Sequence, residues 1–88
     1  MNHRHRQILH ALFAHPVSAN VPLRGVEAVL RDLGAEVQHG HNGRMQVSLA
    51  GRRHGFAHHA HDLTPDEVRE LRKFLIDCGI DPVTQYPL

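Results

Sequence analysis

Histidine and arginine are the residue types in this chain that could do chemistry, and the sequence contains ten and nine of them. Imidazole titrates near pH ~6.5, so a histidine can exchange a proton close to neutrality, and the forked guanidinium of arginine suits phosphate. The formal net charge is only +1, which by itself favours no class of partner. Phosphates raise the pKa of nearby imidazoles, so this near-neutral chain would become basic beside RNA. The alternative is that most of these histidines are solvated surface residues that reflect a biased composition.

Two basic clusters lie at predicted turns and strand ends. His39 and His41 flank a turn next to Arg44, and imidazoles with a guanidinium at a loop tip can contact a phosphate. The basic run 52–54 opens the following predicted strand, and we expect it to mark one polar sheet face together with Arg44. Solvation alone is the alternative for both clusters, because turns collect polar residues and charges on an edge strand discourage strand pairing. The candidate RNA-binding residues are Arg44, Arg52, Arg53 and His54.

The sequence predicts neither a metal site nor a bound cofactor. Histidines 58, 59 and 61 end a predicted strand, where alternation sends His58 and His59 to opposite faces, and no cysteine or carboxylate at zinc-finger spacing completes a set. The single cysteine, Cys78, excludes an intramolecular disulfide and is expected to be a small buried apolar residue. Glycine-rich phosphate loops, the Gly-x-Ser-x-Gly elbow and His-Glu-x-x-His are all missing, which excludes most cofactor-dependent enzymes and hydrolases.

Length and composition indicate one small domain over residues 1–88. Its 41% of hydrophobic residues is compatible with a folded core. The longest apolar run is Ala11–Ala14, four residues, against the ~18 that a membrane span needs. No apolar signal-peptide core is present, so we expect a cytoplasmic protein without membrane contact.

Periodicity predicts an α+β fold with the order α-α-β-β-β-α. Apolar residues at helical spacing predict helices over 3–14 and 24–33, joined by a proline-containing connector, and Gly34 suits a left-handed helix end. From Ala35 the period changes to two, which predicts a three-stranded antiparallel meander packed against the helices on one face. The predicted strands are 35–39, 44–49 and 52–58, with turns at 40–43 and 50–51.

The last helix, over 65–78, has the clearest local signature. Thr64-Pro65-Asp66-Glu67 fits a capping box, and Leu63 with Val68 fits the hydrophobic staple that often accompanies it. Gly79 suits the left-handed ending, with Ile80 packing back on the helix. Residues 82–88 are expected to form a loose tail.

Residues 24–80, about two-thirds of the chain, resemble the HicA family of bacterial mRNA interferase toxins. The resemblance implies the fold of a small double-stranded-RNA-binding domain, here with an extra N-terminal helix and connector in residues 1–23 and a tail in 81–88. It also implies binding of RNA, cleavage of RNA without metal, and neutralisation by a HicB-like antitoxin. The matching stretches are Val26–Leu30, Leu33–Val37, Asn42–Gly51, Phe56–His61 and Leu71–Ile80.

One departure from the family pattern affects the expected chemistry. The catalytic imidazole of the family comes from a Gly-Ser-His triplet at the start of the second strand, and Asn42-Gly43-Arg44 stands at that place here. An arginine cannot act as the general base for a 2′-hydroxyl, although it can stabilise a pentacovalent phosphate. Cleavage must then use another imidazole, and the candidates are His41, His54 and His58, with Arg44, His41 and His58 as the predicted catalytic set.

Two functional hypotheses remain open from the sequence. The first is an mRNA interferase toxin that uses one of these histidines. The second is a catalytically silent module on the same fold that binds RNA or a partner protein. If the polar sheet face is the functional surface, we expect a HicB-like antitoxin to cover Arg44, Arg52 and Arg53 with carboxylates, because masking an RNA site requires complementary charge. RNA sequence preference and oligomeric state do not follow from the sequence.

Overall fold

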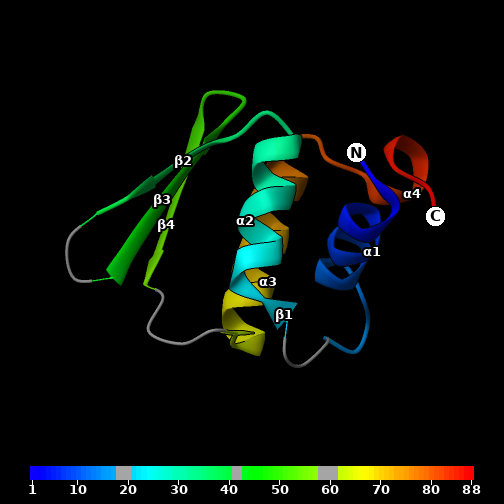
Figure 1. Ribbon diagram of the computed structural model, residues 1–88, viewed down its shortest axis with the longest axis horizontal. Coiled ribbons are helices and arrows are strands. Elements are labelled where there is room, and N and C mark those ends of the chain that lie inside the picture. The colour runs from blue at the N-terminus through cyan, green and yellow to red at the C-terminus, as the bar shows by residue number, and fades with distance from the viewer. Residues whose placement is uncertain (18–20, 41–42, 58–61) are drawn as a thin grey trace.

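The computed structural model describes residues 1–17, 21–40, 43–57 and 62–88 (Figure 1). It confirms a small α+β domain with a three-stranded antiparallel sheet in the order β2-β3-β4. The helices are α1 (His3–Leu12), α2 (Leu23–Asp32), α3 (Pro65–Asp77) and α4 (Pro82–Gln85). The strands are β1 (Val21–Pro22), β2 (Glu36–His39), β3 (Arg44–Leu49), β4 (Arg52–Ala57) and β5 (Asp62–Leu63).

The helices all lie on one side of the sheet (Figure 1). Helix α2 packs next to β2 and α3 packs next to β4, while α1 packs on the far side of the two helices from the sheet. Both central helices contribute to one apolar core, to which the sheet adds its alternate side chains Val37, Met45 and Val47. The opposite side of the sheet is left without a covering helix in the described part of the chain.

Helix ends follow the predicted local chemistry. The Thr64 hydroxyl accepts a hydrogen bond from the backbone N–H of Glu67 at 3.2 Å, and the Glu67 carboxylate accepts one from the N–H of Thr64 at 2.8 Å, which completes the capping box. Helix α2 is followed by its C-cap Leu33 and then by Gly34, whose φ of +94° places it in the left-handed region. The N–H of Ala35 then returns to the carbonyl of Leu30 at 2.9 Å, as in a Schellman ending.

The β3–β4 hairpin is closed by a two-residue turn. Ala50 and Gly51 both have positive φ, +53° and +78°, which is the type I′ arrangement. The turn fixes a register in which Leu49 pairs with Arg52 and Arg44 pairs with Ala57. Every side chain of the hairpin is thereby assigned to one face of the sheet or the other.

Two parts of the chain differ from the predictions. The tail expected to be loose instead forms α4, which packs against α1, and His10 Nε2 lies 2.7 Å from the carbonyl of Tyr86. A second, two-stranded sheet pairs β1 with β5, with Val21 opposite Leu63. Both side chains are buried, so this short pairing joins the segment just before α2 to the segment just before α3.

None of the helices in the described residues has the length and apolar character that a membrane-spanning helix requires.

Candidate nucleic-acid interface

The side of the sheet that faces away from the helices is polar, and we call it the outer face. Because side chains alternate along a strand, the buried residues Met45 and Val47 fix their neighbours Arg44 and Gln46 on the opposite side, where both are exposed. Register then extends the outer face across the other two strands. Its described members are Glu36, Gln38, Arg44, Gln46, Ser48, Arg53 and Gly55.

The two cations of the outer face lie near its opposite ends. Arg53 pairs with Ser48, four residues along β3 from Arg44, which corresponds to ~13 Å at the usual rise of a strand. Between them lie the carboxamides of Gln38 and Gln46, at directly paired positions, and Gly55, which leaves the backbone of β4 open. Guanidinium and amide donors spaced along a flat surface can hold successive phosphates and sugar hydroxyls of an extended RNA strand.

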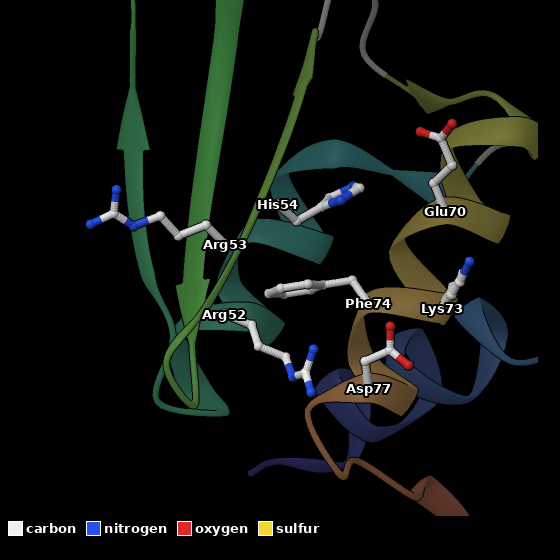
Figure 2. A pocket seen from close by; sticks show the side chains of 7 residues that line it. All are labelled: Arg52, Arg53, His54, Glu70, Lys73, Phe74 and Asp77. Carbon is white, nitrogen blue, oxygen red and sulfur yellow. The ribbon is translucent and has the colours of Figure 1, made fainter.

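Arg52 does not share the outer face, so the expectation of a single face for Arg44, Arg52 and Arg53 is wrong for Arg52. It immediately precedes Arg53 on β4, and consecutive strand residues point to opposite sides. Figure 2 shows the Arg52 side chain directed toward Asp77 of α3, whereas the Arg53 side chain points away from that helix. The basic run 52–54 is therefore divided between two surfaces.

His54 also lies on the helix side of the sheet. Its ring stacks on Phe74 of α3 with centroids 5.3 Å apart and contacts Phe56 at 5.6 Å. Burial lowers the pKa of His54, and the nearby carboxylate of Glu70 opposes that effect. Its Nε2 is buried without a hydrogen-bond partner in the described structure. His54 is thus a neutral, half-buried ring that cannot reach a substrate on the outer face.

The other two catalytic candidates, His41 and His58, lie outside the described residues. The described residues beside them converge on Arg44. The N–H of Gly40 donates to the carbonyl of Arg44 at 2.7 Å, and Ala57 is the register partner of Arg44 on β4. Arg44 therefore lies beside the chain positions that lead to both candidates.

No protein family matches the chain, and no curated protein or solved structure matches it either. Among the described residues of the outer face, only Glu36 carries a carboxyl group, and its register partner Ser48 lies ~13 Å along β3 from Arg44. The described part of the outer face is thus equipped to bind anions and carries no imidazole.

Several other histidines have structural partners. His39 Nε2 lies 2.6 Å from Glu27 Oε1, and His5 contacts Asp32. Partial burial raises the pKa of Glu27, but hydrogen bonds from His39 and Arg31 and their charges outweigh it, so the pKa is lowered overall. In the described ranges no group of three or more histidine, cysteine or acidic residues could hold a metal ion.

Cys78 has no feature of a nucleophile. Its thiol donates to the carbonyl of Leu49 at 3.4 Å, and burial raises the pKa of the thiol although Arg52 opposes the effect.

Sequence reasoning missed the outer-face residues Glu36 and Gln38. The signal for both was present, since they flank Val37, whose burial follows from the same alternation.

Proposed function

We propose that this protein is a HicA-like RNA-binding toxin component that holds RNA on the outer face of its sheet. The observation that carries the proposal is the exposed set of donors on this face, with Arg44 and Arg53 at its ends and carboxamides between them. Arginine dominates the cations of the chain, as suits phosphate contacts, and the sequence resemblance to mRNA interferases points to the same ligand. The substrate would be messenger RNA in the cytoplasm.

A cognate HicB-like antitoxin would neutralise the protein by covering the outer face. Masking two arginines whose backbone positions lie ~13 Å apart along the sheet requires carboxylates at matching positions, so antitoxin binding should weaken as salt is raised. Arg52 lies on the other side of the sheet and would not be covered by the same contact.

Cleavage of the bound RNA is the second candidate function. It is favoured by the convergence on Arg44 of the described residues that lead to His41 and His58. Arg44 would stabilise the charged phosphate, and one of those imidazoles would take the 2′-hydroxyl proton. Binding without cleavage is favoured by Arg44 itself, which replaces the imidazole expected from the family resemblance.

Binding is tested by fluorescence anisotropy of a labelled single-stranded RNA over a range of salt concentrations. Arg44→Gln and Arg53→Gln should each weaken binding several-fold and lower the salt slope by ~0.7, the value for one phosphate contact on a single strand. Arg24→Gln removes an exposed arginine from α2 and serves as the matched control. Arg52→Gln should behave like that control, and an effect equal to that of Arg53→Gln would contradict the outer-face assignment.

Cleavage is tested on the same RNA with chelator present. An interferase should show a bell-shaped pH profile around neutrality, and either His41→Ala or His58→Ala should abolish cleavage while RNA affinity changes by no more than a few fold. A binder should show no cleavage, and its affinity should rise steadily as pH falls and several histidines gain charge. Gain of cleavage in Arg44→His would show that the native protein binds without cutting.

A further inference from the structure

A cleft of about 280 Å³ opens between β4 and α3, on the helix side of the sheet (Figure 2). His54 stacked on Phe74 forms its aromatic centre. The charged side chains around this centre are those of Arg52, Glu70, Lys73 and Asp77, and in the described structure none of them forms a salt bridge; the Arg53 side chain points away. The lining residues are Arg52, Arg53, His54, Glu70, Lys73, Phe74 and Asp77.

The cleft lies directly beside a free strand edge. The carbonyl of Arg44 accepts the N–H of Gly40, so the backbone groups of Arg44 are directed toward β2. Its register partner Ala57 therefore directs its own N–H and carbonyl away from β3, and alternation extends this to Gly55 and Arg53. Among the described strands none pairs with this side of β4, so three residues present backbone donors and acceptors to an incoming chain.

The space at this edge fits a strand without a helix of its own. Neighbouring strands lie ~4.8 Å apart, whereas packed helices need 8–10 Å, roughly twice as much. A second copy that paired its own β4 antiparallel to this edge would place its α3 on the same side of the sheet, because α3 packs next to β4. The two α3 helices would then be separated by about one strand spacing, which is too close for packed helices. An extended segment would instead direct alternate side chains into the cleft. Gly55, with only the Met45 carbonyl near the place of a Cβ, leaves the middle of the edge open.

Charge gives the segment a direction. Glu70 lies at one end of the cleft. Toward the other end, beside the β3–β4 turn, Asp77 lies between Lys73 and Arg52, so the two cations leave this end with a net positive charge (Figure 2). A strand that runs antiparallel to β4 starts near Ala57 and ends near Arg52. It is matched by a basic residue near its start, an apolar residue over Phe74, and acidic residues at its end.

We propose that this cleft binds an extended segment of a partner polypeptide, which adds to β4 as a fourth, antiparallel strand. The segment carries a basic residue, an apolar residue and acidic residues in that order along the chain. Main-chain hydrogen bonds to Arg53, Gly55 and Ala57 supply affinity, and the cleft selects the alternate side chains. This site is separate from the outer face and does not depend on the RNA-binding proposal.

The probe is the hexapeptide acetyl-Thr-Lys-Thr-Val-Glu-Glu-amide, titrated into isotopically labelled protein and followed by amide chemical shifts in NMR. Aligned with β4, its third and fifth residues direct their N–H groups to the edge and its fourth directs its N–H away. N-methylation of the third and fifth residues should weaken binding about tenfold or more, because two main-chain bonds are lost. N-methylation of the fourth should change affinity by less than about twofold, and a peptide with its two charged ends exchanged should bind more weakly.

On the protein side, Gly55→Pro removes an edge-directed N–H, whereas the control Gly55→Ala keeps it. The first should weaken binding about tenfold or more and the second should leave it nearly unchanged. If Gly55→Pro fails to fold, the N-methylated peptides on the native protein decide the question alone. The proposal is overturned if no amide chemical shift changes at millimolar peptide, or if the changes are confined to the outer face. It is also overturned if the peptide methylated at its third and fifth residues binds as tightly as the peptide methylated at its fourth. Sedimentation that shows a dimer dispersed by Gly55→Pro would assign the edge to a second copy and would overturn it as well.

Discussion

The turn between β3 and β4 offers a direct test of the structure through stability. Ala50 adopts a φ of +53°, a left-handed conformation that costs an L-residue with a Cβ about 1–2 kcal/mol. Asparagine tolerates this conformation, and Asn-Gly is the preferred pair in a type I′ turn. Ala50→Asn should therefore raise the free energy of unfolding by about 1 kcal/mol. In a domain of this size that gain corresponds to a Tm increase of about 4–8 °C.

Urea unfolding followed by circular dichroism measures the effect. With a slope of about 1–2 kcal/mol per molar urea, the midpoint of Ala50→Asn should rise by about 0.5–1 M while the slope stays constant. Gly51→Ala is the matched control at the neighbouring position, where φ is +78°, and its midpoint should fall by a similar amount. An Ala50→Asn midpoint equal to or below that of the native protein would refute the two-residue turn. The register that separates Arg52 from Arg53 would lose its support in the same experiment.

Three further predictions concern the cleft residue His54, the contact of Arg72 with the end of α1, and the N-cap of α3. Because the pKa of His54 is lowered in the folded protein, the unfolded chain takes up a proton on this imidazole at a higher pH than the folded protein does. The free energy of unfolding should therefore fall as the pH drops through ~6.5. His54→Leu should reduce that loss when urea midpoints at about pH 7.5 and pH 5 are compared. Arg72 donates to the carbonyls of Leu12 and Ala14 at 2.8 and 2.9 Å, so Arg72→Met should lower the urea-derived unfolding free energy by about 2 kcal/mol. Thr64→Ala removes the N-cap of α3 and should cost about 1 kcal/mol in thermal or urea unfolding, an amount that Thr64→Ser should largely restore.

Much of the fold could be predicted because its signals are local. The capping box at Thr64, the left-handed Gly34 and the change of period at Ala35 each depend on residues within one or two turns of chain. The pairings that were missed join distant segments. Val21 opposite Leu63 is a two-residue contact without a strand-length pattern, and α4 is one turn of helix whose contacts are with α1 at the other end of the sequence.

The candidate site was only partly predictable for a related reason. Alternation alone correctly places Arg44 and Gln46 outside, and applied strictly it also separates Arg52 from Arg53. Reading the basic run 52–54 as one cluster overrode that rule. The stacking of His54 on Phe74 could not be anticipated, because it depends on how α3 approaches β4.

Strand β4 borders both proposed binding surfaces, and this has a consequence for how they communicate. A chain that pairs with β4 becomes part of the sheet, so every second side chain on it lies on the outer face, which is widened by ~4.8 Å, and one of these side chains lies opposite Arg53. Acidic side chains at those positions would compete with phosphate for Arg53, and basic ones would lengthen the track available to RNA. One ligand would thereby reset the affinity for the other by direct adjacency, with no change of backbone conformation and no signal carried through the core.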